Sequence, residues 1–218
     1  MMQRYELIVF DWDGTLMDSA GMIVHCVQEA ARDLGILPPS DERARHIIGL
    51  GLVDALRHAL PDLSEDHYED LVERYRHHYL SRDHELEMFA GAEELVQNLA
   101  KSGCWLGVAT GKSRRGLDRA LEHSGLGACF HATRCADECH SKPHPQMLEE
   151  LMAEFAVSPA TTLMIGDTTH DLMMAQNAGV DAVAVSYGAH PRNVLEAVAP
   201  RYCAHSVEEL TNWLQANA

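Results

Sequence analysis

Two aspartates, Asp11 and Asp13, directly follow a short apolar run, Leu7–Phe10, and only one residue separates them. Residues two apart in an extended chain point to the same side, so both carboxylates can face one point if the strand geometry continues. Two like charges held this close repel each other, and a divalent cation would relieve the repulsion. Because Mg²⁺ prefers oxygen ligands, the pair indicates a possible magnesium site.

Three further polar clusters follow apolar or turn-like stretches. They carry Thr110 with Gly111, then Lys142, and finally Asp167 with Asp171. If Asp171 lies on the first turn of a helix, the spacing of four places it near Asp167. Each cluster alone is weak, because aspartates at strand ends often only cap helices or form turns. Their common position at the ends of strand-like runs indicates a shared site.

Short apolar runs alternate with longer amphipathic stretches over most of the chain. The expected strands are Leu7–Phe10, 104–109, 161–165 and Asp181–Val185, and the expected helices are 92–101, 113–123, 145–155 and 171–178. Nearly continuous apolar runs of this length are typical of strands buried on both faces. The alternation predicts an α/β fold, a Rossmann-like doubly wound parallel sheet with helices on both faces. Ligands bind beyond the carboxyl ends of such strands, where the polar clusters lie.

The stretch between the first strand and residue 88 shows no convincing strand. Residues 19–34, 52–60 and 64–80 have helical periodicity, with breaks at Gly35, at Pro38 and Pro39, and at Pro61. We therefore expect a helical cap, residues 17–87, inserted into a catalytic core formed by residues 1–16 and 88–218.

Composition narrows the class of protein. Among 218 residues, 46% are hydrophobic, and 33 Asp and Glu face 17 Lys and Arg. This acidic balance argues against nucleic acid or an acidic membrane as a partner. No run is long enough for a membrane span, and the first apolar run is too short for a signal peptide. We expect a cytoplasmic protein, a monomer or a homodimer, with reduced cysteines.

The ordered clusters resemble the motifs of the haloacid-dehalogenase superfamily of phosphohydrolases, in the branch with an inserted helical cap. Asp11-x-Asp13-Gly14-Thr15 matches the first motif, Thr110 the second, Lys142 the third and Gly166-Asp167-x3-Asp171 the fourth. The similarity covers nearly the whole chain and is greatest to phosphoglycolate-phosphatase-like members. It implies a catalytic core of the same fold with a helical cap.

The resemblance also implies roles for the acidic residues. Asp11 would attack phosphorus and form an aspartyl phosphate, which splits one difficult displacement into two. Asp13 would protonate the leaving oxygen and then activate water. Mg²⁺ would be held by the Asp11 carboxylate, the main-chain carbonyl of Asp13 and Asp167, and Asp171 would bind or brace it.

The second and third motifs would bind the phosphoryl group. Thr110 and nearby amides such as that of Gly111 would hold phosphoryl oxygens, and Lys142 would neutralise charge shared with Asp11. The implied activity is that of a Mg²⁺-dependent phosphatase acting on a small-molecule phosphate ester. A pyrophosphatase, a sugar-phosphate or nucleotide phosphatase and a phosphosugar mutase remain alternatives.

The expected cap carries the candidate residues for substrate selection. Arg43, Arg45 and His46 precede the glycine pair of Gly49 and Gly51. The resemblance places a loop near here in the active site, so these cations or Gly49 could contact a substrate carboxylate such as that of phosphoglycolate. Equally, both arginines could lie on a solvated helix face.

Two features outside the four motifs allow other interpretations. The run Lys112-Ser113-Arg114-Arg115 places bases at an expected helix start, where they could bind an anion or simply be solvated. The preceding residues resemble a nucleotide-binding P-loop, but Gly107 is one residue too late for that motif. A P-loop NTPase and a non-catalytic metal-binding protein are therefore the rivals from other classes.

Overall fold

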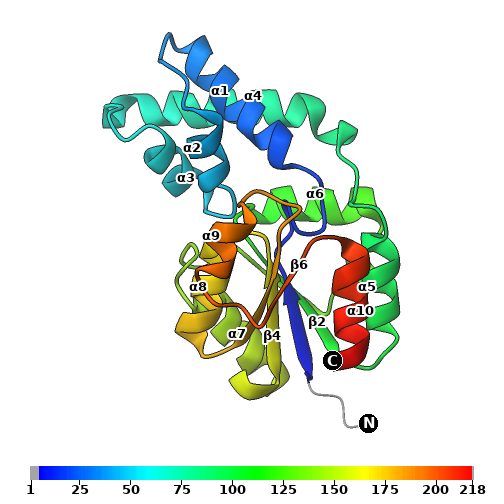
Figure 1. Ribbon diagram of the computed structural model, residues 1–218. Helices are drawn as coiled ribbons and strands as arrows, with labels where there is room; N and C mark the ends of the chain where they lie inside the picture. Colours follow the sequence, from blue (N-terminus) through cyan, green and yellow to red (C-terminus); the bar gives the residue numbers. More distant parts are fainter. Residues whose placement is uncertain (1–4, 218) are drawn as a thin grey trace.

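Six parallel strands form the centre of the molecule (Figure 1). The computed structural model describes residues 5–217. The strands are β1 (Leu7–Phe10), β2 (Trp105–Thr110), β3 (Ala132–Cys135), β4 (Thr162–Gly166), β5 (Asp181–Val185) and β6 (Tyr202–Ala204). Their order is β3-β2-β1-β4-β5-β6, and every neighbouring pair is parallel. The strand order reverses beside β1, so the carboxyl ends of β1 and β4 flank the position where such sheets bind ligands.

Four of these strands lie within one residue of the sequence prediction, and the α/β fold is confirmed. Strands β1 and β4 are buried along their whole length, as their apolar runs require. The edge strands β3 and β6 were not predicted. The sequence of β3, ATRC, is mostly half-buried and β6 has only three residues, so neither gives an apolar run.

Helices cover both faces of the sheet. The helices α5 (Ala92–Ala100), α6 (Arg114–Ser124) and α10 (Val207–Asn217) contribute to one apolar cluster. The helices α7 (Gln146–Phe155), α8 (Thr169–Ala178) and α9 (Arg192–Glu196) contribute to another on the opposite face. Two short 3-10 turns, η3 (Gly127–Cys129) and η4 (Pro159–Thr161), complete this body. Helices α5 to α8 follow the predicted periodicity, and α8 ends at Gly179 as expected.

A second group of helices lies beyond the carboxyl end of the sheet, at the top of Figure 1. It contains α1 (Ala20–Asp33), α2 (Asp41–His46), α3 (Leu52–Ala59), η1 (Glu65–His67), α4 (Tyr68–Arg82) and η2 (Asp83–Glu85). It has its own apolar cluster, which Ala189 joins from the body, and Tyr79 packs both against this cluster and against one that flanks the sheet. We call residues 17–87 the helical segment. Helix α2 was not predicted, because only Ala44 of its six residues is buried.

The chain enters and leaves the helical segment at neighbouring points. The amide of Asp18 donates to the carbonyl of Glu87, and the amide of Phe89 donates to the carbonyl of Leu16. An isolated bridge pairs Met17 with Met88 between them. These contacts agree with the proposed division at residues 17 and 88, which stays a prediction.

Within residues 5–217, no helix has both the length and the apolar character needed to cross a bilayer. All six cysteines are free thiols, as the sequence led us to expect.

Candidate active site

The four sequence motifs meet at the carboxyl end of the sheet. Asp11 follows β1, Asp167 follows β4, Asp171 lies in the first turn of α8, and Lys142 reaches them from the loop before α7. Each of these side chains is buried, with at most 2% of the residue exposed. The predicted clusters that carry Asp11, Lys142, Asp167 and Asp171 therefore lie together, at the carboxyl ends of β1 and β4.

Lys142 is the positive centre of this group. Its Nζ donates to Asp11 Oδ1 at 2.7 Å and to Asp171 Oδ1 at 2.6 Å. Burial alone would lower the pKa of Lys142, but the two carboxylates raise it above its usual value, so the ammonium group stays charged. The lysine cannot balance every charge around it, because Asp167 is a third carboxylate of the same cluster.

The three carboxylates leave a place for a cation. One oxygen from each of Asp11, Asp167 and Asp171 lies within 4.8 Å of the other two. Among the residues that the structure describes, Asp11 Oδ2 is buried and has no hydrogen-bond partner, which is costly for a carboxylate oxygen. With all three ionised, one ammonium group leaves the cluster with excess negative charge. A divalent cation would supply both the missing partner and the missing charge, so the residues fit such an ion.

The pKa values of the carboxyl groups reflect the same excess of negative charge. Burial raises the pKa of Asp11 to about 7, against the lowering effect of Lys142 and with a further rise from Asp171. Burial, followed by the charges of Asp11 and Asp171, raises the pKa of Asp167 well above its usual range. The pKa values of Asp11 and Lys142 can both be raised, because Asp11 shares the Lys142 ammonium group with Asp171.

The Asp167 carboxylate is held by groups from two other parts of the chain. Its Oδ1 accepts from Thr15 Oγ1 at 3.0 Å, and its Oδ2 accepts from the amide of Ala189 at 2.7 Å. The loop after β5 must approach closely to make the second bond. A Cβ at Gly188 would lie 2.3 Å from Asp167 Oδ2 and 2.3 Å from the carbonyl oxygen of Gly14. Glycine at 188 is therefore a steric requirement of the site.

Asp171 braces the group from the start of α8. Its Oδ2 accepts from the amide of Thr168 at 3.1 Å and from Thr168 Oγ1 at 2.7 Å, which completes a capping box. Since its Oδ1 accepts from Lys142, both oxygens have protein partners. This arrangement suits a residue that positions Lys142 and the carboxylate cluster.

Asp13 faces a different set of partners, toward the helical segment. Its Oδ1 accepts from Ser19 Oγ at 2.7 Å and lies 3.0 Å from Lys112 Nζ. Lys112 also donates to the hydroxyl of Tyr79 on α4 at 2.8 Å. Sequence reasoning did not assign Lys112 to the site, although its position two residues after Thr110 was a usable signal.

The basic run around Lys112 divides into separate contacts. Ser113 caps α6, as expected, by accepting from the amide of Gly116. Arg114 pairs with Glu138 at 2.8 Å and also bonds Thr133, so its charge serves the packing of α6 against β3. Arg115 is exposed. The run is therefore neither one anion site nor one solvated face.

Thr110 and Gly111 lie where the helical segment touches the sheet. Thr110 is fully buried, and its Oγ1 accepts from the amide of Lys112 at 3.2 Å. A Cβ at Gly111 would lie 2.4 Å from the carbonyl oxygen of Leu50 and 2.6 Å from that of Gly49. The loop that carries Gly49 thus lies directly against the second motif.

A cleft of about 360 Å³ adjoins Asp13 between the sheet and the helical segment. Many of its lining side chains are apolar, including Ile23, Val27, Ile47, Leu50, Tyr75 and Tyr79. Its lining cations are Arg76, Lys112 and Arg119. A larger cleft of about 480 Å³ is lined by residues such as Glu87 and Phe89 and by none of the motif side chains. Because Asp13 and Gly111 of the motifs line the first cleft, this cleft and not the larger one is the candidate substrate site.

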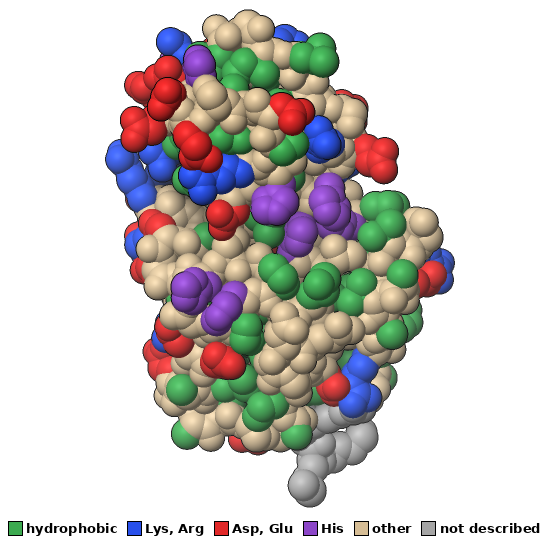
Figure 2. Space-filling view, turned by 90° about the vertical axis from the view of Figure 1, so that its left-hand side faces the viewer, with side chains coloured by type: hydrophobic (Ala, Val, Ile, Leu, Met, Phe, Trp, Pro, Cys, Tyr) green, Lys and Arg blue, Asp and Glu red, His purple; other side chains and the backbone are tan. Residues whose placement is uncertain are grey.

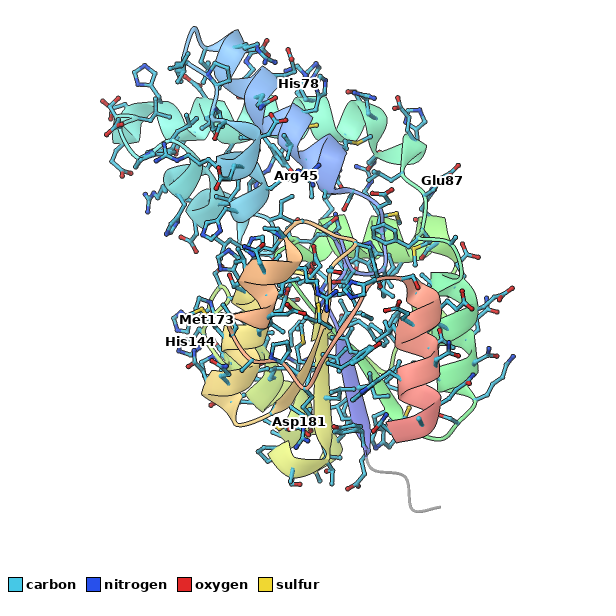
Figure 3. The ribbon with its side chains drawn as sticks, viewed as in Figure 1. Arg45, His78, Glu87, His144, Met173 and Asp181 are labelled. Carbon is cyan, nitrogen blue, oxygen red and sulfur yellow. The ribbon has the colours of Figure 1, made fainter. Side chains whose placement is uncertain are left out.

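The candidate substrate residues of the helical segment do not stay together. Gly49 lines the cleft, but Arg43, Arg45 and His46 are exposed on α2 and are not among its lining residues. Arg45 is labelled on the helical segment in Figure 3, above the body that carries the labelled His144 and Met173. A carboxylate-binding role for the three α2 side chains therefore has no support from their positions.

His46 instead lies against two histidines beside the catalytic group. Its ring stacks on that of His190, with the centroids 5.0 Å apart, and its carbonyl oxygen accepts from His170 Nε2 at 2.7 Å. Burial lowers the pKa of His170, and it lowers the pKa of His190 to about 4, so both rings are neutral at pH 7.

Several supporting groups were missed because they carry no chemistry in the sequence alone. Ser19, Tyr79 and Thr168 are common residue types at unremarkable spacings. The amide of Ala189 has no residue-specific signal at all. Such groups become visible only when the fold brings them to an aspartate.

Comparison with known proteins agrees with the fold and the motifs. Residues 8–185 match the family model described as haloacid dehalogenase-like hydrolase. The "Probable phosphatase IndB" of Dickeya dadantii is 37% identical over 211 residues, covering 94% of this chain and 91% of that protein. A "Phosphoglycolate phosphatase" of Vibrio parahaemolyticus is 29% identical over 225 residues, covering 99% of each chain.

A solved structure extends the agreement to the whole fold. A hydrolase from Pseudomonas syringae superposes with a TM-score of 0.88 at 23% identity, covering 97% of this chain and 98% of that one. The match spans the helical segment as well as the sheet. The family model, the named relatives and the assembled motifs agree, and this chain is an enzyme of the haloacid dehalogenase-like hydrolase family, of its phosphatase type.

Proposed function

We propose that this enzyme is a Mg²⁺-dependent phosphatase that hydrolyses a small-molecule phosphomonoester through an aspartyl phosphate on Asp11. One observation carries the proposal. Asp11 is completely buried among the clustered carboxylates, one of its oxygens is fixed by Lys142, and the other has no hydrogen-bond partner within residues 5–217. Asp11 is thus a carboxylate with one oxygen oriented by Lys142 and one free of protein donors, so that the pair can bind the ion and attack phosphorus.

Magnesium is the proposed ion because the donors are oxygens. Asp11 and Asp167 would hold it together with the main-chain carbonyl of Asp13, and Asp171 would brace them. When bound, the ion neutralises charge on the transferring phosphoryl group.

In the first step, an oxygen of Asp11 attacks phosphorus and the bond between phosphorus and the ester oxygen breaks. Asp13 gives its proton to the departing oxygen, which leaves as an alcohol. The contacts of Asp13 support this role, because Ser19 and Lys112 hold only its Oδ1. Oδ2 can then carry the proton toward the cleft.

In the second step, ionised Asp13 takes a proton from water, whose oxygen attacks phosphorus. The bond between phosphorus and Asp11 breaks, and inorganic phosphate leaves. Lys142 neutralises charge shared by Asp11 and the phosphoryl group, while Thr110 and the Gly111 amide hold phosphoryl oxygens. The charge of Lys142 is needed throughout, and its two carboxylate partners maintain it.

The cleft favours an ester whose alcohol carries an apolar or aromatic group. Its apolar lining includes the stacked pair Tyr75 and Tyr79, with ring centroids 5.8 Å apart. Two of its cations already have acidic partners, since Lys112 pairs with Asp13 and Arg119 with Asp83. One relative is named phosphoglycolate phosphatase, so phosphoglycolate is included among the test substrates. The apolar lining suits a small substrate with an additional carboxylate less well.

The central test replaces Asp11 by Asn. We expect phosphate release to fall by at least about 10³-fold, because the amide cannot form the covalent intermediate. Asp18→Asn is a matched control, since it makes the same change at an exposed residue. The D11N melting temperature without divalent ions should equal or exceed that of wild type. Near-normal turnover by folded D11N would disprove the proposed nucleophile.

The substrate is tested by comparing phenyl phosphate, a nucleoside monophosphate, pyrophosphate, a sugar phosphate and phosphoglycolate. We expect kcat/KM for phenyl phosphate to exceed that for phosphoglycolate by about tenfold, the gain from burying a small apolar group. The reverse order would overturn the proposed alcohol class. Sustained dependence on a sugar bisphosphate would identify a mutase instead. A cytoplasmic location and a monomeric or homodimeric state stay predictions.

A further inference from the structure

Three histidines from distant parts of the chain meet where the helical segment joins the sheet-bearing body. His46 ends α2, His170 lies in the first turn of α8, and His190 lies in the loop before α9. One ring nitrogen from each lies within 4.8 Å of the other two. Figure 2 shows histidine side chains gathered at this level of the molecular surface. His46 is exposed, His170 is half-buried and His190 is buried, so the group can be reached from solvent on the side of His46.

Two of the three rings, those of His170 and His190, make hydrogen bonds. His170 Nε2 lies 2.7 Å from the carbonyl oxygen of His46, and His190 Nε2 lies 3.2 Å from the same oxygen. His190 Nδ1 accepts from the amide of Thr169 at 3.1 Å. These bonds join α2 to the body through the backbone of residue 46. They do not require a histidine there, and among residues 5–217 no hydrogen bond to the His46 ring is found.

We propose that His46, His170 and His190 form a binding site for a transition-metal ion of the Zn²⁺ type, separate from the carboxylate cluster. Three neutral imidazoles are a common ligand set for such ions, and the fourth position would remain open to solvent. Carboxylate oxygens suit Mg²⁺, so the two sites differ in donor chemistry as well as in residues.

The bond from His170 to the His46 carbonyl pre-orients one ligand. With its proton on Nε2, His170 presents the lone pair of Nδ1. A metal-bound histidine commonly donates its other N–H to a backbone carbonyl in this way. The stacked His46 ring is exposed and can turn to complete the set.

His190 is the ligand that must change most. To bind through Nε2, it releases the His46 carbonyl, gives up the bond that Nδ1 accepts from the Thr169 amide, and places its proton on Nδ1, where Thr169 Oγ1 at 3.4 Å can accept it. The three nitrogens must also contract toward the separation of about 3.3 Å that a tetrahedral Zn²⁺ ion requires. We therefore expect His46 and His170 to contribute more to affinity than His190.

The test is a Zn²⁺ titration of metal-stripped protein by calorimetry in saturating Mg²⁺, which keeps the carboxylates occupied. Wild type should bind one equivalent, and His46→Gln should weaken this by at least about tenfold without loss of folding, because the residue is exposed. His170→Gln should act similarly. His144→Gln is the matched control, since His144 pairs with His140 elsewhere on the body, and it should bind Zn²⁺ like wild type.

Co²⁺ provides a readout that does not depend on turnover. Its visible absorption should report nitrogen ligation in wild type and in Asp11→Asn, and it should be lost in His46→Gln. Absence of a stoichiometric Zn²⁺ site in wild type, or unchanged affinity in His46→Gln, would overturn the inference. Because Asp11→Asn should retain the site, failure here is distinguishable from failure of the proposed phosphatase mechanism.

Discussion

At the scale of single residues, the site depends on one lysine that lies among more carboxylates than it can neutralise. Lys142 serves Asp11 and Asp171 directly, while Asp167 depends on neutral donors. The fold therefore stabilises a local charge excess that is useful only when a cation and a phosphoryl group arrive. Function and stability compete at this point of the molecule.

The raised pKa of Asp11 makes this competition measurable. Its carboxyl titrates at about 7 in the folded protein instead of 3.8, so the folded state binds more protons than the unfolded state between these values. Without divalent ions, stability should fall as pH rises through this window, by roughly 4 kcal/mol at most. Since Mg²⁺ binds the ionised form, it should raise the melting temperature more at pH 8 than at pH 5.

Thermal melts with Mg²⁺ or EDTA at both pH values check this prediction, and EDTA should also stop turnover until Mg²⁺ is restored. Asp11→Asn is the control, because it removes the titrating group and should reduce the pH dependence of the Mg²⁺ effect. An equal Mg²⁺ increment at pH 5 and pH 8 in wild type would contradict the assignment.

Lys112 should act as a positioning residue through Asp13. Replacing it by Met keeps most of the side-chain volume but removes the ion pair at 3.0 Å and the bond to Tyr79. We expect kcat to fall by about 10-fold to 100-fold, with a displaced acidic limb of the pH profile. Arg114→Met, which breaks a pair with Glu138 instead, should lower stability and leave the pH profile unchanged. An unaltered profile in Lys112→Met would exclude this role.

At the scale of elements, the site is assembled where strands end. The four motif groups were predictable because each follows an apolar run or opens a helix, and these signals survive in the sequence. The supporting contacts were not, since the bonds of Thr15 and of the Ala189 amide to Asp167 join separate parts of the chain, and Ser19 is a common residue type at an unremarkable spacing. Edge strands β3 and β6 escaped prediction for a related reason, because half-buried strands do not need continuous apolar residues.

The loop after β5 offers a test at this scale. Gly188→Ala would force a methyl group against Asp167 Oδ2 and the Gly14 carbonyl. We expect the loop to move, the Ala189 bond to break, and Mg²⁺ affinity measured by calorimetry to fall by 10-fold or more. Gly21→Ala in α1 is the control, because a Cβ there meets nothing within 4 Å. Wild-type Mg²⁺ affinity in Gly188→Ala would show that the loop does not shape the site.

At the scale of the whole molecule, the sheet supplies the phosphoryl chemistry and the helical segment supplies most of the wall of the adjoining cleft. The sequence periodicity was sufficient to predict four of the strands, helices α5 to α8 and a helical stretch after the first strand. It was insufficient to place α2, whose polar surface reflects exposure, or to predict that His46 would lie against the body. Contacts between separately packed parts depend on shape, which local periodicity does not encode.

The chain enters the helical segment at Leu16–Asp18 and leaves it at the adjacent Glu87–Phe89, and this closeness has an evolutionary consequence. A stretch of chain whose two ends coincide can be exchanged for another, or closed with a tight turn, without disturbing any strand register. Selection for a substrate with a different alcohol could then replace the inserted segment while the sheet and its catalytic residues stay unchanged.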